Sequence, residues 1–189
     1  MFNYFKILLL GILFVTGCSN IPSTEEIDND IAKIDREIKE ATTTVQNYSG
    51  GLLSVLASVR LETLKTTKAM LEQKRTGFKR YIHVTYTVNG NKYSPPKDKD
   101  KLLEEIKKDI ENLENELKEA KEESKQYGGG LLGVLSLTRV ATIKNSIAFL
   151  EQRRLLLKHD IPYYSILPAD SKNNEPGFKA TPGRDIDKF

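Results

Sequence analysis

The residue types that most often carry catalysis or bind metal ions are scarce in this chain of 189 residues, which contains one cysteine and two histidines. His83 lies in a segment that alternates apolar and polar residues like a β-strand, and His159 follows a long helical pattern, where the helix dipole favours a cation. Neither has further ligands at the spacing of a metal site. The many carboxylates lie on solvated helix faces, and no pair is marked out as general acid and base. We therefore expect no enzyme, no catalytic residue, no metal and no cofactor.

Two glycine clusters, at residues 50–51 and 128–130, do not have the strand before them or the Lys-Ser/Thr ending that a phosphate-binding loop needs. The chain carries 29 Lys and Arg residues against 26 Asp and Glu residues, a formal net charge of +3, and opposite charges are interleaved. Such a balance gives no long-range attraction to polyanions. We therefore expect no nucleic-acid partner.

Cys18 is the one residue to which the sequence assigns a chemical role. It closes a leading segment in which Lys6 is the only charge, an apolar run extends from residue 7 to 14, and Val-Thr-Gly precedes the cysteine. The run is shorter than the roughly 20 apolar residues of a spanning helix. Residues 1–19 resemble the signal peptide and lipobox of bacterial lipoproteins. The resemblance implies cleavage before Cys18, a diacylglycerol on its thiol and an acyl chain such as palmitate on its new amino group.

This resemblance makes residues 1–17 a signal peptide and residues 18–25 a lipidated cysteine with a short tether. It implies attachment to the cell-envelope membrane through the N-terminal lipid. Ser19 resembles the pattern sent to the outer membrane, facing the periplasm, in cells with two membranes. An ordinary signal peptide with a chance cysteine and an uncleaved anchor are the alternatives. Because there is no second cysteine, an exported domain must fold without an intramolecular disulfide.

The rest of the chain contains an internal duplication with an offset of 79 residues. Residues 48–75 match residues 127–154 at 15 of 28 positions, which indicates a repeated supersecondary unit. We assign residues 26–167 to one domain with repeats at about 26–88 and 102–167. Residues 168–189, rich in Pro, Gly, Asp, Asn and Lys, are predicted to be a flexible tail.

Each repeat opens with apolar residues at alternating steps of four and three, which form one seam of a helix. The seams are Ile27, Ile31, Ile34, Ile38, Ala41, Val45 and Tyr48, and then Ile106, Ile110, Leu113, Leu117, Ala120, Ser124 and Tyr127. The glycine clusters follow and end these helices. Second helices are predicted at about 52–78 and 131–158, with seams at Leu53, Ala57, Leu61, Leu64, Leu71 and Phe78, and at Leu132, Ser136, Val140, Ile143, Ile147, Leu150 and Leu157.

Helices joined by so few residues run antiparallel, so each repeat is a helical hairpin. Two related hairpins would bury their apolar faces against each other as a four-helix bundle with pseudo-twofold symmetry. Between the repeats, alternation over residues 81–88 followed by Asn89-Gly90 predicts a β-hairpin. Residues 161–167 could add a third strand. The expected class is therefore α+β, mainly α, with a small β-hairpin or three-stranded sheet.

Two arginines that match between the repeats, Arg60 and Arg139, lie beside the apolar seams. One interpretation is that they hydrogen-bond to the partner helix or to carboxylates such as Glu72 and Glu151. The other is that they form polar contacts with an anionic ligand or partner.

The most similar segments of the two repeats are a tyrosine, glycines and paired leucines. Adjacent leucines cannot both face one seam, so one of each pair should reach another element, a partner or lipid. We take these as candidate partner-binding residues: Tyr48, Leu52, Leu53, Tyr127, Leu131 and Leu132. Tight packing at the turn is the structural alternative.

These observations favour a membrane-tethered, noncatalytic binding or scaffold lipoprotein of the bacterial envelope, with a protein partner of unknown identity and an unknown oligomeric state. An inhibitor or immunity-type lipoprotein that neutralises a toxin or envelope enzyme is the alternative. An enzyme acting on envelope material is a more distant one. A binding module predicts an exposed apolar patch, whereas an enzyme predicts a cleft with clustered ionisable groups.

Overall fold

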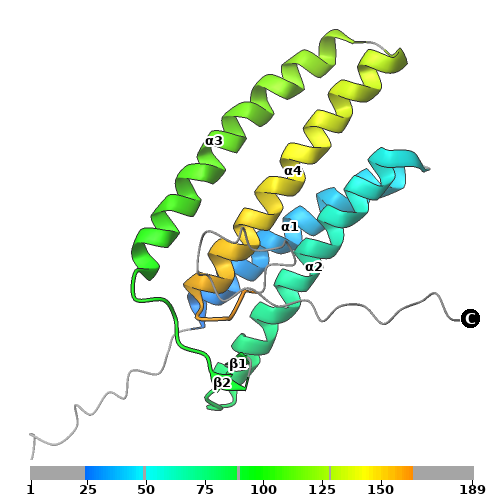
Figure 1. Cartoon of the computed structure of the whole chain (residues 1–189). Helices are drawn as coiled ribbons and strands as arrows, with labels where there is room; N and C mark the ends of the chain where they lie inside the picture. The colour runs from blue at the N-terminus through cyan, green and yellow to red at the C-terminus, as the bar shows by residue number, and fades with distance from the viewer. Residues whose placement is uncertain (1–23, 49, 89, 128, 164–189) are drawn as a thin grey trace, which may run out of the picture.

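The computed structural model describes residues 24–48, 50–88, 90–127 and 129–163. Its helices are α1 (Glu25–Asn47), α2 (Gly51–Lys79), α3 (Lys99–Gln126) and α4 (Gly130–Lys158), and its strands are β1 (Thr87–Val88) and β2 (Asn91–Lys92). Helix α1 packs on α2, α2 on α4 and α3 on α4, which confirms the predicted bundle of two helical hairpins with a small β-hairpin (Figure 1). The predictions for Cys18, the signal peptide and residues 168–189 lie outside the described residues. None of the described helices is long and apolar enough to cross a membrane.

The described residues of the two hairpin turns have nearly the same backbone conformation. Helix α1 is capped by Tyr48, whose N–H donates to the carbonyl of Val45 at 3.3 Å, and Tyr127 caps α3 in the same way. Gly51 and Gly130 then begin the second helices with φ of 76° and 70°, in the left-handed region that residues with a Cβ rarely adopt. The duplicated glycines therefore reverse the chain by the same means in both repeats.

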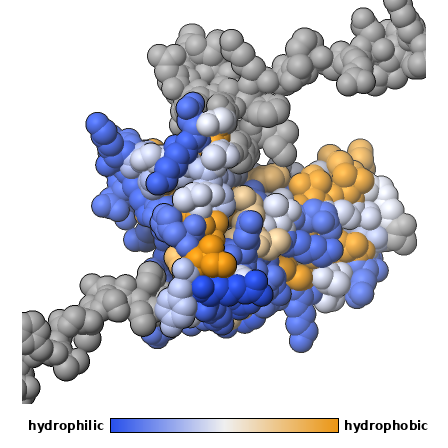
Figure 2. Space-filling model, turned by 90° about the horizontal axis from the view of Figure 1, so that it is seen from below, coloured by the Kyte–Doolittle hydropathy of each residue, from blue (hydrophilic) through white to orange (hydrophobic). Residues whose placement is uncertain are grey.

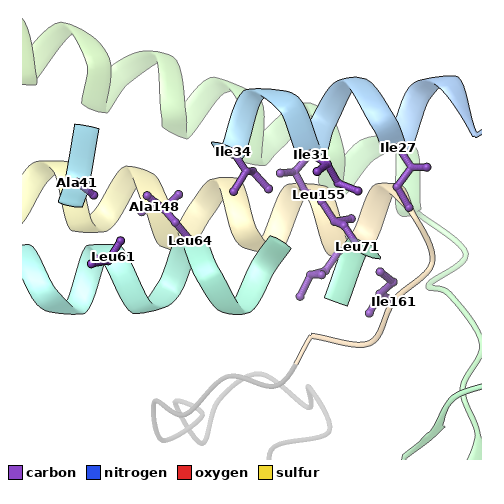
Figure 3. Close-up of a cluster of buried hydrophobic side chains, with 11 residues drawn as sticks. Ile27, Ile31, Ile34, Ala41, Leu61, Leu64, Leu71, Ala148, Leu155 and Ile161 are labelled. Carbon is purple, nitrogen blue, oxygen red and sulfur yellow. The ribbon is translucent and has the colours of Figure 1, made fainter. Parts of the chain in front are cut away.

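The main core lies between α1, α2 and α4 (Figure 3). Its buried residues come largely from the predicted seams: Ile27, Ile31, Ile34, Ala41, Leu61, Leu64, Leu71, Ala148, Leu155, Leu156 and Ile161. A smaller cluster of Ile106, Ile110 and Leu157 joins α3 to α4. Since each fully buried Leu or Ile contributes about 1.5–3 kcal/mol, the main core contributes more to stability than the smaller cluster does.

The two hairpins do not have equivalent surroundings, although each has the same internal fold. Helix α1 packs on α2 and also reaches α4, where Lys33 Nζ lies 2.8 Å from Glu151 Oε1. The residue of α3 that corresponds to Lys33 is Asn112, which is exposed. The two hairpins therefore share one internal fold, as the predicted pseudo-twofold relation requires, but their packing on each other is not symmetric.

Helix α4 is displaced along α2 relative to the position that the duplication alone would give. Ala57 of α2 lines a groove together with Ala141 of α4, and Leu64 lines a second one together with Ala148. The 79-residue offset would instead pair Ala57 and Leu64 with residues five positions earlier in α4. Five residues correspond to about 7.5 Å of helix. The turn of the α3–α4 hairpin accordingly projects beyond the turn of the α1–α2 hairpin (Figure 1).

The predicted β-hairpin forms, but its ladder is shorter than the alternating pattern indicates. Thr87 is opposite Lys92 in the antiparallel pair. The segment before β1 runs close to α2 at Gly77, where an added Cβ would overlap Val84 Cγ2 and would lie 3.1 Å from the carbonyl oxygen of Ile82. Packing on the helix thus takes the place of part of the predicted strand.

Of the two alternatives for the sheet, the structure has the two-stranded hairpin: residues 161–163, the described part of the possible third strand, have no strand partner. After α4 the chain turns at Asp160, whose φ is 54°. The N–H of Ile161 then donates to the carbonyl of Leu156 at 2.8 Å, and Ile161 is fully buried in the main core. Burial of this isoleucine ties the segment to the bundle instead of to the β-hairpin.

Candidate docking surface at the hairpin tips

The turns of the two hairpins lie at the same end of the molecule, and the helices that follow them expose large apolar side chains. Figure 2 shows apolar residues gathered at the right of the molecule, on the side where the turns lie in Figure 1. We call the following residues the tip surface: Leu52 and Val55 of α2, and Leu131, Leu132, Val134 and Leu135 of α4. Leu131 is 74% exposed and Leu52 is 58% exposed. Contiguous exposed apolar residues are typical of interaction sites.

The six candidate partner-binding residues divide into two groups. Leu52, Leu131 and Leu132 are exposed on the tip surface, and Tyr127 is exposed beside it. The other two, Tyr48 and Leu53, are half-buried and line a groove between the hairpins.

The placement of Leu132 in a buried seam is wrong, since 59% of this residue is exposed. Its counterpart Leu53 is half-buried because α4 extends past it. Because α4 is displaced, α2 does not reach the level of Leu132. Val55, Val134 and Leu135 lie in the same two segments, but the six candidate residues did not include them. The signal that could have found them is the absence of any charged residue from 48–59 and 127–138.

A groove separates the two tips and is lined by residues of α1, α2 and α4. Its volume is about 60 Å³, and its walls include Leu56 and Val140. Asn145 lies among the lining residues and is only 7% exposed, and its Oδ1 has no hydrogen-bond partner. Sites for small molecules are several times larger, about 300–1,000 Å³. The groove therefore does not have the size of an enclosed substrate site.

The two matched arginines are engaged within their own hairpins. Arg60 on α2 lies 3.4 Å from Glu40 Oε1 and 3.7 Å from Glu37 Oε2, both on α1. Arg139 on α4 lies 2.6 Å from Glu123 Oε2 on α3. The interpretation that they contact the partner helix agrees with this geometry.

The prediction that these arginines hydrogen-bond to Glu72 and Glu151 is wrong. Glu72 faces Lys68 and Arg75 of its own helix, and Glu151 faces Lys33 and Arg154. The seams place the matched arginines toward the first helix of each hairpin, several turns away from these glutamates.

The carboxylates around Arg60 have shifted pKa values for different reasons. Burial raises the pKa of Glu37 above its ordinary value, although Arg60 and Lys33 oppose this effect. A hydrogen bond from Lys144 lowers the pKa of Glu40, outweighing partial burial. The Lys144 ammonium lies 2.8 Å from Glu40, which links α4 to α1 beside the groove.

A second ionic cluster lies at the opposite end of the bundle, where α1 begins and α4 ends. Asp30 Oδ2 accepts from Lys158 Nζ at 2.8 Å and lies 2.8 Å from His159 Nε2. Burial opposes the ionisation of Asp30, but hydrogen bonds and charges from His159 and Lys158 outweigh it and hold the pKa of Asp30 below its ordinary value. This cluster joins the two helix ends. The other histidine, His83, lies between α2 and β1 and is exposed to solvent.

Within residues 24–163, apart from the three positions left undescribed, no group of three or more His, Cys, Asp or Glu side chains could hold a metal ion. What the described geometry offers is an apolar surface at one end of a charged bundle. Comparison with protein-family models, curated proteins and solved structures finds no match.

Proposed function

We propose that this protein is a membrane-tethered, noncatalytic binding or scaffold lipoprotein of the bacterial cell envelope, and that the tip surface is where it docks. The observation that carries the proposal is the exposure of apolar residues at both hairpin turns, led by Leu131 at 74%. The resemblance of residues 1–19 to a lipoprotein signal supports the tether.

The position of the tip surface relative to the tether supports a docking role. Helix α1 begins at Glu25, the last residue of the proposed tether, and its 23 residues extend for about 34 Å toward the tips. Residues 18–24 can span only about 23–25 Å even when fully extended. A lipid at Cys18 would therefore hold the other end of the bundle near its membrane and leave the tip surface free to meet a partner.

Site-specific photocrosslinking in the native cell tests this proposal. A photoreactive amino acid replaces Leu131 on the tip surface, and in a matched control it replaces Ile82, which is 56% exposed but follows α2 at the opposite end of that helix. We expect a discrete adduct from the Leu131 position and none from the Ile82 position. Equal labelling from both, or labelling from Ile82 alone, would contradict the proposed docking surface.

The alternative of a toxin-neutralising inhibitor predicts one tight complex of defined stoichiometry. Mass determination of the adduct from the Leu131 position distinguishes the two functions. A single small catalytic protein captured at a one-to-one ratio would favour the inhibitor, whereas lipid or a structural envelope component would favour the binding or scaffold role.

A further inference from the structure

We infer that the tip surface inserts into a phospholipid bilayer, and that this bilayer is a different one from the membrane that holds the tether. The inference rests on the proposed function and names the partner of the same surface. Its starting point is composition: residues 48–59 and 127–138 contain no Asp, Glu, Lys or Arg, in a chain of which 29% is charged. Such segments avoid the cost of burying charge in an apolar medium.

The exposed apolar residues of α4 point in many directions. Successive helix residues are about 100° apart, so Leu131, Leu132, Val134, Leu135 and Leu137 cover roughly 220° of the circumference. All five are exposed. The two other residues in this two-turn stretch of α4, at positions 133 and 136, are buried. A protein partner covers one side of a helix, whereas a bilayer surrounds an inserted tip on every side, and this distribution fits the bilayer.

The residues next to the tip suit the boundary of a membrane. Tyr127 precedes the turn and is 38% exposed, and tyrosine favours the level of lipid headgroups. Lys125, the nearest charge below it on α3, is 2.7 Å from Glu122, and Arg139 on α4 is 2.6 Å from Glu123. We call these four charged residues the collar, and because each positive charge lies beside a negative one, the collar is neutral. Insertion would therefore be insensitive to salt. Its depth would be about 5–10 Å, as is usual for apolar helix faces at a membrane surface.

The arrangement of the bundle favours end-on contact with a second bilayer. The sides of the helices carry exposed charges such as Lys65 and Glu62, so a bundle lying flat would press them against lipid. The proposed tether joins Glu25, at the end opposite the tip surface. An upright bundle would thus hold one membrane by Cys18 and contact another by its tips.

The absence of tryptophan from the chain gives a direct test of insertion. The full chain from residue 18 to 189, with Cys18→Ser to exclude acylation, is given a single tryptophan as Leu131→Trp, Val55→Trp or the control Ile82→Trp. Each replaces an exposed residue. The variants are mixed with vesicles of phosphatidylethanolamine and phosphatidylcholine, with and without bromine-labelled acyl chains.

We expect a blue shift and strong bromine quenching for Leu131→Trp. Val55→Trp should be quenched less, because the first turn of α2 lies about 7.5 Å short of the first turn of α4 along the bundle. Ile82→Trp should not respond. No response from Leu131→Trp, or an equal response from Ile82→Trp, would overturn the inference. Binding that depends on anionic lipid and disappears in 0.5 M salt would also overturn it, because the collar is neutral.

Charge substitution separates loss of insertion from loss of folding. Leu131→Asp should weaken vesicle binding by at least about tenfold, while Ile82→Asp should leave it unchanged. The aspartate stands in the first turn of α4, where the helix dipole favours an acid, so the thermal midpoint should not fall. Vesicle binding that survives Leu131→Asp would refute insertion through this tip.

The single cysteine permits a test of bridging. For this test Cys18 is kept: the chain from residue 18 to 189 is coupled through Cys18 to a maleimide lipid in one set of vesicles, and unmodified vesicles are then added. Light scattering should rise, and Leu131→Asp should abolish the rise. If scattering does not rise, or if the chain instead forms a dimer that Leu131→Asp dissociates, the second bilayer is excluded. A protein adduct in the photocrosslinking experiment would still support the proposed function in that case.

Discussion

Truncation of leucines along α2 and α4 should change stability according to burial, although the residues are matched between the repeats. The variants are Leu131→Ala, Leu132→Ala, Leu53→Ala and, as the core reference, Leu71→Ala. Full burial of a leucine contributes about 1.5–3 kcal/mol. Leu131 is 74% exposed, so its truncation should cost less than about 1 kcal/mol. Leu71 is 0% exposed, and its truncation, which also leaves a cavity, should cost about 2–5 kcal/mol.

Leu53 and Leu132 provide the sharpest comparison because they are equivalent in the duplication. Leu53 lines the groove and is half-buried, so its truncation should reduce the free energy of unfolding by about 1–2 kcal/mol. Leu132 is exposed, so its truncation should cost as little as that of Leu131. Urea denaturation followed by circular dichroism gives each free energy of unfolding. Equal losses at Leu53 and Leu132 would show that the two tips have the same surroundings. Losses at Leu131 that match Leu71 would show that the tip surface is core.

Three other changes test the tether and the packing. Cys18→Ser should stop processing and incorporation of a fatty-acid label, and a variant still cleaved before residue 18 that fractionates with membranes as before would refute lipidation. Asp30→Asn should cost about 1.5–3 kcal/mol at pH 7; because the folded pKa of Asp30 is lowered, this stabilisation is present above the unfolded pKa of about 3.9 and is lost as pH falls through the folded value. Denaturation curves that stay equally separated at pH 2 and pH 7 would contradict it. Gly77→Ala should destabilise by about 1–3 kcal/mol, whereas Gly133→Ala, whose Cβ meets only ordinary contact at 3.5 Å, should stabilise by about 0.5–1 kcal/mol; thermal melts with the opposite order would refute the packing at residue 77.

Sequence reasoning predicted the hairpins because their formation depends on local interactions. The steps of four and three place Ile27, Ile31 and Ile34 on one face, and all three are buried in the core. Gly51 and Gly130 reach nearly the same left-handed conformation, since identical neighbours impose the same turn. The short β-hairpin around Gly90 follows from equally local chemistry.

The parts that were left open or predicted wrongly depend on what packs beside each element. Residues 161–163 have a strand-like composition, but Ile161 is buried against the bundle, where it removes more apolar surface from water than an edge strand would. Arg60 and Arg139 select the glutamates that face them on the neighbouring helix. No periodicity within one helix reveals which carboxylate on another will be within reach.

The sequence by itself determined two copies of one helical hairpin, their turns and their apolar seams, because backbone hydrogen bonds and side-chain periodicity act within each repeat. Only the tertiary structure decided that α4 would lie displaced along α2 by about five residues, since that register is set by side chains along the whole contact between the two helices. The displacement half-buries Leu53 and leaves Leu132 exposed. Two almost identical turns thereby acquire different surroundings, and the second one becomes the projecting end of the tip surface.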